Sequence, residues 1–406
     1  MRNDNLTIIL AGGVGSRLEP LTNDRTKPAV PFGGKYRIID FSLANCLHSG
    51  LRRILVLTQY KSYSLHKHLR DGWSIFNPEL GEYVTAVPPQ MRTGNYWYRG
   101  TADAIYQNLY LVKRSGVKTV LILSGDHIYR MDYAAMLKIH HAKQAEMTIA
   151  TMAVPVAEAS DFGVLSIDEN CRVNTFQEKP LAPETLPDDS MHALVSMGIY
   201  VFSVDLLIQT LEADAENESS HHDFGKDIIP NLIDRHAVYA YQFGTRQGRV
   251  SQDCYWRDVG NVDSYYQANM DLLKLVPPLN LFQSNWPIRS YQAQNPPMRA
   301  VPGASGGEGV FVNSTAAAGV VIEGGNVHFS ILFARVVIAD KAMINNAILF
   351  DGVSVGVGAQ LQNCIVDKNV EIPAGESVGF NIEKDRARFT ISEKGIVVIP
   401  KNYSFK

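Results

Sequence analysis

The sequence predicts two domains, an α/β domain built on a mainly parallel sheet and, after it, a parallel β-helix. Three observations carry this prediction. Apolar runs alternate with helix-length segments up to about residue 260, six prolines then fall within residues 277–302, and small and apolar residues finally recur every six positions. At about 150 residues per domain, a chain of 406 residues has room for two or three such units.

Continuous apolar runs in the first part predict strands that are buried on both faces of a parallel sheet. Between these runs, the helical spacing of Ala102, Ile105, Leu109 and Val112 predicts a helix over Ala102–Ser115. Because ligands of such sheets bind outside the carboxyl ends of the strands, we expect the functional site there. The four predicted strands are Thr7–Leu10, Arg53–Leu57, Thr119–Leu123 and Met147–Thr151.

A last helix is predicted over Val262–Val276, directly before the prolines. Proline lacks a backbone N–H and fixes its own backbone angle, so residues 277–302 are predicted to form an extended linker. We therefore expect one domain over residues 1–276 and a second over residues 303–406.

The second domain is characterised by a period of six. Ile338, Ile344 and Phe350 follow this spacing, as do Val355 and Leu361, although the phase of the repeat drifts along the chain. One apolar residue per short step is typical of a parallel β-helix, in which each step forms one side of a coil. The alternative is an ordinary meander of short strands. On either interpretation these residues build a core and carry no chemistry.

Composition excludes several classes of function. The 38 basic and 41 acidic residues give a net charge of −3, which favours neither a nucleic-acid-binding protein nor a membrane-surface protein. No apolar run is long enough to span a membrane. The cysteines lie too far apart for a zinc site or a disulfide scaffold, so we expect reduced thiols in a cytoplasmic protein. They are Cys46, Cys171, Cys254 and Cys364.

A glycine-rich segment follows the first predicted strand, in the string LAGGVGSRLEPLTNDRTKPAVPFGGK. Gly12, Gly13 and Gly15 would let the backbone approach a phosphate closely. Arg17 and Lys27 would add positive charge beside it. The glycines match neither the P-loop pattern nor GxGxxG, and taken alone they would also suit a tight turn.

The longer string resembles the opening of the sugar-nucleotide pyrophosphorylases. Its extension PFGGKYRIIDFSLANC resembles one branch, the glucose-1-phosphate adenylyltransferases of bacterial glycogen synthesis. Further motifs of that family follow in the family's order over nearly the whole chain. They are WYRGTADA (Trp97–Ala104), SGDHIY (Ser124–Tyr129), QEKP (Gln177–Pro180), SMGIYVF (Ser196–Phe202), HDFGKDIIP (His222–Pro230) and YWRDVG (Tyr255–Gly260).

The resemblance implies a fold, a reaction and an assembly. The fold is a dinucleotide-binding-like nucleotidyltransferase domain followed by a left-handed parallel β-helix with regulatory and oligomerisation roles, in a homotetramer. The reaction joins ATP and α-D-glucose 1-phosphate to give ADP-glucose and pyrophosphate. Because the sugar phosphate is itself a competent nucleophile, catalysis requires positioning and charge neutralisation rather than a protein nucleophile.

The resemblance also implies a Mg²⁺ site. Asp126 follows a strongly apolar strand, at the edge of the sheet where ligands bind. The family places Mg²⁺ on this aspartate and on a second one, here Asp258, and two carboxylates suit this ion. We expect His127 to support the site rather than to bind the metal.

Substrate contacts carry over residue by residue. Arg17 and Lys27, with the backbone of the three glycines, would hold the ATP phosphates, and Lys179 would hold the phosphate of the sugar. The adenine would lie against Gln90, Tyr98, Gly100 and Thr101. The sugar would lie against Glu178, Ser196, Asp223 and Trp256.

Regulation is where the chain departs from the family pattern. The position that carries an activator-binding lysine in the enteric branch is Asp24 here, and a carboxylate repels a phosphate. Val14 likewise replaces a residue that is often basic. We therefore expect intact catalysis with altered activation by sugar-phosphate or nucleotide effectors. The other regulatory candidates are Arg25, Gln59, Arg386 and Arg388.

Three other functions fit the sequence less well. A related pyrophosphorylase that uses another nucleoside triphosphate would share the metal site and differ only in its base pocket. A non-catalytic regulatory subunit would lack charged groups that are present here. An acyltransferase would rest on the β-helix alone, and a fold does not carry a function.

Overall fold

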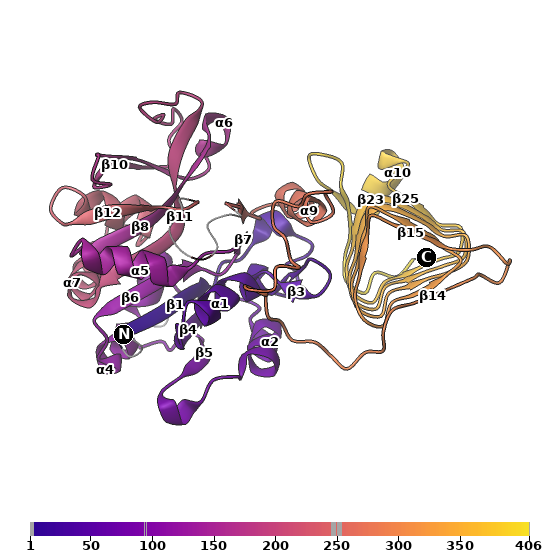
Figure 1. Ribbon diagram of the computed structural model, residues 1–406, viewed down its shortest axis with the longest axis horizontal. Helices are drawn as coiled ribbons and strands as arrows, with labels where there is room; N and C mark the ends of the chain where they lie inside the picture. Colours follow the sequence, from indigo (N-terminus) through magenta and orange to yellow (C-terminus); the bar gives the residue numbers. More distant parts are fainter. Residues whose placement is uncertain (1–3, 93, 95, 245–248, 250–253, 406) are drawn as a thin grey trace.

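The computed structural model describes residues 4–92, 94, 96–244, 249 and 254–405, and it consists of an α/β domain beside a β-helix (Figure 1). No helix among these residues is long and apolar enough to cross a membrane. The β-helix is seen almost along its axis in Figure 1, as a stack of three-sided coils that contains the C-terminus.

The α/β domain contains a nine-stranded sheet with β1 near its centre. The strand order is β10-β9-β11-β6-β1-β4-β5, and β8 and β12 extend the sheet from β11. Strands β6, β1, β4 and β5 are parallel, whereas β11 runs antiparallel to β6, β8 and β9, so the sheet is mixed. The strands are β1 (Asn5–Ala11), β4 (Arg53–Thr58), β5 (Tyr83–Val87), β6 (Thr119–Ser124), β8 (Met147–Pro155), β9 (Gly163–Ile167), β10 (Val173–Glu178), β11 (His192–Ser203) and β12 (Val238–Gln242).

Helices cover both faces of this sheet, which explains the continuous apolar runs. Ile8 and Ile122 belong to the core on one face, and Ile9 and Leu123 to the core on the other. The α-helices of the described residues are α1 (Ile39–His48), α2 (Tyr63–Trp73), α3 (Thr101–Tyr106), α4 (Leu109–Ser115), α5 (Tyr133–Ala142), α6 (Val156–Ala159), α7 (Val204–Ala215), α8 (Ile229–Leu232), α9 (Val262–Asp271) and α10 (Ile382–Arg386).

Two predicted helices differ from the observed ones. The helix predicted over Ala102–Ser115 is broken at Asn108, whose side chain donates to the carbonyl of Ala104 and so competes with the helical backbone. The helix predicted over Val262–Val276 ends at Asp271. The last residues of the predicted helix approach Pro277 and Pro278, and a proline disfavours helical backbone at the residue before it.

Two short ribbons lie next to the main sheet, at the edge where the strands β1 and β6 end. One pairs β7 (His127–Tyr129) with β13 (Trp256–Asp258), and the other pairs β2 (Pro31–Phe32) with β3 (Tyr36–Arg37). The first ribbon joins chain segments that are far apart in sequence.

The second domain is a left-handed β-helix whose coils are 17 residues long along most of its length. Val337 pairs with Ser354, and Ser354 pairs with Glu371. Three sides of six residues would need 18, so each coil is one residue short, which explains the drifting phase. Asn346 and Asn363 have positive φ angles within long strands, where the chain turns a corner.

The strands of this domain fall into two sheets. The first contains β14 (Arg299–Val301), β17 (Val321–Glu323), β20 (Val337–Ile338), β22 (Ser354–Val355) and β24 (Glu371–Ile372). The second contains β15 (Val310–Val312), β16 (Thr315–Ala316), β18 (Asn326–His328), β19 (Ile331–Leu332), β21 (Met343–Leu349), β23 (Gln360–Val366), β25 (Ser377–Val378), β26 (Thr390–Ile391) and β27 (Val397–Ile399).

The proline-rich segment between the domains packs against the α/β domain. Trp286 is buried, and its indole N–H donates to Asn45 Oδ1 over 3.0 Å. Arg130, fully buried, donates to the carbonyl of Asn280 over 2.6 Å. One core cluster also continues from the α/β domain into the β-helix, where it includes Ile348. The two domains therefore form one packed unit.

Candidate active site

The glycine loop begins where β1 ends, at the carboxyl edge of the parallel strands. Gly15 has a φ of 70°, which a residue with a side chain rarely adopts. Thr22 Oγ1 donates to the carbonyl of Gly15 over 2.9 Å, and Thr26 Oγ1 donates to that of Ala11 over 3.1 Å. Two threonines of the segment that follows the loop therefore fix its shape.

Lys27 ends this segment and lies between two carboxylates. Its Nζ is 2.7 Å from Asp126 Oδ2 and 2.9 Å from Asp258 Oδ1, and its side chain is 9% exposed. Burial alone would lower the pKa of Lys27, but the two carboxylates outweigh burial and raise it. Burial would likewise raise the pKa of Asp126, but Lys27 and then His127 hold it well below its usual range. All three charges are thus mutually stabilised.

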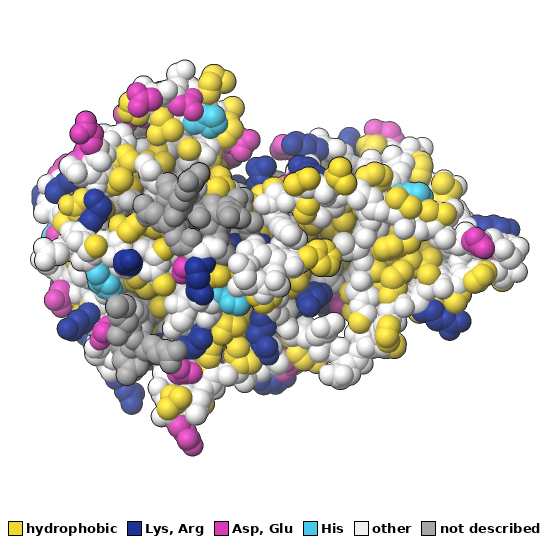
Figure 2. Space-filling view, viewed as in Figure 1, with side chains coloured by type: hydrophobic (Ala, Val, Ile, Leu, Met, Phe, Trp, Pro, Cys, Tyr) yellow, Lys and Arg dark blue, Asp and Glu magenta, His cyan; other side chains and the backbone are white. Residues whose placement is uncertain are grey.

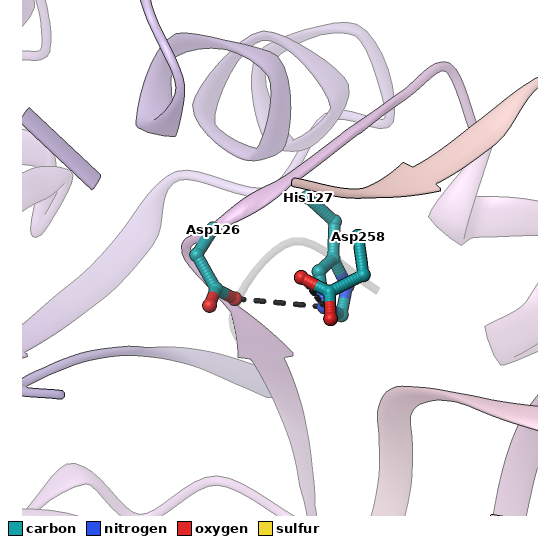
Figure 3. A group of neighbouring side chains, drawn as sticks. All are labelled: Asp126, His127 and Asp258. Carbon is teal, nitrogen blue, oxygen red and sulfur yellow. Dashed lines mark ion pairs between the residues drawn. The ribbon is translucent and has the colours of Figure 1, made fainter. Parts of the chain in front are cut away.

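The ribbon of β7 and β13 brings the two aspartates together. Asp126 directly precedes β7, and Asp258 ends β13 opposite His127 in the antiparallel register. Figure 3 shows the three side chains converging from these two strands. One ligand atom from each lies within 4.8 Å of the others, which is the spacing of a metal-binding group. His127 Nδ1 is buried and has no hydrogen-bond partner among the described residues.

A cavity of about 590 Å³ opens beside the glycine loop and Lys27. It is lined by most of the residues that the sequence assigned to the nucleotide. Asn108 supports this wall, because its amide donates to the hydroxyl of Tyr98 over 3.0 Å. The predicted residues that line the cavity are Gly12, Gly13, Gly15, Arg17, Lys27, Gln59, Tyr98, Gly100, Thr101, Asp126 and Asp223.

Of the residues assigned to the sugar, Asp223 lines this cavity, whereas Glu178, Lys179, Ser196 and Trp256 do not belong to its lining. Asp223 also accepts a hydrogen bond from Thr101 Oγ1 over 3.0 Å. Burial raises the pKa of Glu178, and Asp223 adds to this rise against the opposing charge of Lys179. The amine of Lys179 is 3.7 Å from Glu178, and its side chain is 59% exposed.

Trp256 contacts the group of Asp126, His127 and Asp258, and Ser196 lies on β11. The Trp256 ring packs edge-on against His127, with 5.1 Å between ring centroids. Its indole nitrogen is buried and has no hydrogen-bond partner within the described part of the chain. Ser196 lies at an irregularity of β11, where its hydroxyl accepts from the N–H of Gly198 over 3.3 Å.

Other predicted residues lie outside the cavity. Gln90 is exposed, and its amide donates to the carbonyl of Pro88. Asp24 forms an exposed ion pair with Lys401 of the β-helix domain, at 3.3 Å. Arg25, the next residue, is buried and pairs with Asp367 of the β-helix at 3.0 Å.

Arg386 and Arg388, near the C-terminus, do not share an ion-pair partner with Arg25 among the described residues. Arg388 pairs with Asp385 at 3.1 Å and with Glu376 at 3.3 Å. Arg386 is exposed at the end of α10. The structure therefore joins Asp24 and Arg25 to the β-helix, but through residues other than these arginines.

Sequence reasoning did not single out several residues that shape the site. Thr22 and Thr26 fix the glycine loop, and Ser124 donates to Asp126. The threonines lie in the glycine-rich string, but their role depends on hydrogen bonds to residues 7 and 15 positions earlier, which no local sequence pattern predicts. Tyr60 also lines the cavity and stacks on Trp97.

Comparison with known proteins covers both domains. A family model described as nucleotidyl transferase matches residues 6–275, and one described as GlmU-like, C-terminal hexapeptide matches residues 296–399. Over 99% of this chain, 65% of residues are identical to glucose-1-phosphate adenylyltransferase 2 of Vibrio parahaemolyticus, and all of that protein is covered. The protein of the same name from Vibrio cholerae is 61% identical, with 99% of each chain covered. Glucose-1-phosphate adenylyltransferase of Methylobacillus flagellatus is 46% identical over 98% of this chain and 94% of its own.

Replacing Gly100 by alanine should disturb the cavity wall. A Cβ at this position would lie 2.2 Å from the carbonyl oxygen of His222, so the backbone would have to move. We expect Gly100→Ala to weaken ATP binding at least about tenfold, the loss that about 1.4 kcal/mol of disturbed contacts would cause. Calorimetric titration with ATP measures this. Gly307→Ala, where space is available, is the control. Unchanged ATP affinity in Gly100→Ala would contradict the described wall.

Proposed function

The chain belongs to the glucose-1-phosphate adenylyltransferases, and we propose that the cavity beside the glycine loop is where it joins ATP to glucose 1-phosphate. A phosphate oxygen of the sugar attacks the α-phosphorus of ATP, the bond from this phosphorus to the bridging oxygen breaks, and pyrophosphate leaves. The product, ADP-glucose, supplies glycogen synthesis. The observation that carries the assignment is Lys27 held by Asp126 and Asp258 on the wall of a cavity lined by the glycine loop.

The triphosphate of ATP would lie along the glycine loop. The N–H groups of Gly12, Gly13 and Gly15 would donate to phosphate oxygens, and the guanidinium of Arg17 suits a two-pronged contact with one phosphate. The ammonium of Lys27 would neutralise charge that develops on the α-phosphate. Thr22 and Thr26 fix the glycine loop before the substrate arrives, so its N–H donors need no reorganisation during the reaction.

The base and the sugar would occupy adjoining parts of the site, because Thr101 and Asp223 are hydrogen-bonded to each other. Tyr98, Gly100 and Thr101 would face the adenine, with Gln90 nearby. Lys179 would bind the phosphate of the sugar, and its exposure lets it follow an incoming ligand. Glu178, Ser196 and Asp223 would bind sugar hydroxyls. The indole N–H of Trp256, which has no partner among the described residues, would donate to one further hydroxyl.

Asp126 and Asp258 fit a Mg²⁺ ion. Carboxylate oxygens are the ligands this ion prefers, it usually retains several waters, and one or two carboxylates are enough to hold it. The ligand atoms of the group lie within 4.8 Å of one another. When bound, the ion would neutralise phosphate charge and orient the leaving pyrophosphate. We assign His127 to the support of the aspartates rather than to the metal.

The first test of these roles is Asp126→Asn. The amide keeps the shape of the side chain but removes the charge that binds the metal. We expect turnover to fall by roughly a thousandfold, the scale seen when a group that stabilises transition-state charge is lost. ATP affinity should change far less. Coupled assay of pyrophosphate release and calorimetric binding measure the two effects. Asp24→Asn, an exposed carboxylate outside the cavity, is the control. Full activity in Asp126→Asn would contradict the metal assignment.

We further propose that anionic effectors bind in a second cavity of about 340 Å³, between the two domains. Arg37 of the α/β domain and Arg335 and Lys368 of the β-helix line it. Burial lowers the pKa of Lys368 despite its ion pair with Asp351, and the charges of Arg37 and Arg25 act in the same direction as burial. Such crowded cations would gain from a phosphate group.

The position of Asp24 supports altered activation. Its carboxylate pairs with Lys401, so an acidic group stands at the border of the two domains where the family often has a basic one. We propose that the response to fructose 1,6-bisphosphate is weak or is replaced by another effector. Strong and selective activation by that compound, lost in Arg25→Ala, would contradict this proposal.

Lys368→Gln tests where effectors bind. We expect it to raise the half-saturating concentration of any phosphorylated activator at least about fivefold, within the usual range of coupling between sites. The measurement is activation across a panel of phosphorylated metabolites. Arg388→Gln is the matched control, because Arg388 is engaged by two carboxylates elsewhere on the β-helix. A loss of response in Arg388→Gln alone would instead favour the C-terminal arginines as the effector site.

We also propose a homotetramer in the cytoplasm. Hydrophobic side chains are prominent over the β-helix domain in Figure 2. The edge strand β15 exposes Val310, Phe311 and Val312, each by 36% or more. Such an edge is a natural contact between copies. The buried thiols of Cys46 and Cys364 suit a reducing compartment.

A further inference from the structure

The ammonium of Lys27 occupies the position between the two carboxylates that the proposed function assigns to Mg²⁺. It lies 2.7 Å from one and 2.9 Å from the other. Asp126 projects toward this point from the residue before β7 and Asp258 from the end of β13, and the lysine side chain is almost fully buried. The ammonium therefore serves as the counter-charge of an acidic pair that would otherwise be costly to hold together.

A divalent cation and this ammonium cannot share the position. Both would have to lie between the same two carboxylates, and two like charges a few ångströms apart repel strongly in a partly buried site. Binding of the ion to Asp126 and Asp258 therefore requires that Lys27 leaves them.

The anchoring of Lys27 allows such a move without a change of the backbone. Its Cβ lies so close to Gly15 that a Cβ on that glycine would be 3.1 Å away. Thr26, the preceding residue, is fixed by its bond to Ala11. The side chain therefore starts beside the glycine loop, and its flexible four-carbon stem can direct the ammonium to the carboxylates or to a phosphate on that loop.

We propose that Lys27 excludes the divalent cation from nucleotide-free enzyme and releases the two aspartates only when the phosphates of ATP take its ammonium. This inference rests on the proposed function, because it uses the same aspartates as metal ligands. The movement of Lys27 would then have two effects. Its ammonium would exchange the carboxylates for a phosphate, and the carboxylates would exchange the ammonium for the metal ion. ATP and the cation would bind with positive coupling, each raising the affinity of the other by the same factor.

The test is titration of the full-length, nucleotide-free protein with Mn²⁺, with free Mn²⁺ followed by electron paramagnetic resonance. Lys27→Met removes the ammonium and keeps the apolar stem. We expect it to bind Mn²⁺ at least about tenfold more tightly than the unaltered protein, equivalent to ~1.4 kcal/mol. Arg17→Met is the matched control. It removes a cation from the same cavity that lies near Asp258 but forms no ion pair with either aspartate among the described residues, so its gain in Mn²⁺ affinity should be clearly smaller than that of Lys27→Met.

The possible outcomes separate this inference from the proposed function. Equal Mn²⁺ affinity in Lys27→Met and in the unaltered protein overturns the exclusion by Lys27. A gain that persists in Lys27→Met/Asp126→Asn shows that the ion binds elsewhere, and then the metal assignment itself fails. A gain that disappears in the double variant supports both.

Circular dichroism checks that the variants fold, and Lys27→Gln replaces Lys27→Met where the latter does not. If neither variant folds, Mn²⁺ binding to the unaltered protein, measured with and without nucleotide, tests the inference. Stoichiometric Mn²⁺ binding without nucleotide overturns the inference, and Mn²⁺ binding that appears only with α,β-methylene-ATP, beyond the Mn²⁺ held by the nucleotide alone, supports it.

Discussion

One buried lysine held by two carboxylates is the interaction around which the rest of this enzyme is arranged. Lys27, Asp126 and Asp258 come from three segments that meet only because β1 and β6 are neighbours and because β7 pairs with β13. Each charge alone would be costly in a half-buried position, so the three must be placed together. The mixed sheet, the ribbon beside it and the threonine-fixed loop all serve this placement.

The β-helix contacts the same short segment that carries Lys27. Asp24 and Arg25 bind Lys401 and Asp367, and Lys27 follows two residues later. A displacement at the border of the domains would therefore be transmitted to the ion triad through a few residues of continuous backbone. This proximity gives a physical route by which an effector between the domains could change catalysis, without a long chain of intervening contacts.

The sequence predicted the fold class because buried strands and a stacked coil leave periodic apolar patterns. It also singled out many of the residues that line the cavity beside the glycine loop, because they lie in unusual strings. It placed a helix across Asn108, where a side chain competes with the backbone, and it extended α9 toward two prolines. A drifting period of six conceals coils of 17 residues. The contact of Lys27 with both aspartates, and that of Arg25 with Asp367, depend on tertiary pairing that no local pattern contains.

The central claim is that the two aspartates exchange one cation for another when ATP binds. A crystal structure of the enzyme with Mn²⁺ and α,β-methylene-ATP tests it most directly, because anomalous scattering locates the metal. We expect the Mn²⁺ signal between Asp126 and Asp258, with the ammonium of Lys27 on a phosphate oxygen. A Lys27 still paired with both carboxylates, and Mn²⁺ bound elsewhere or by the phosphates alone, would contradict the account.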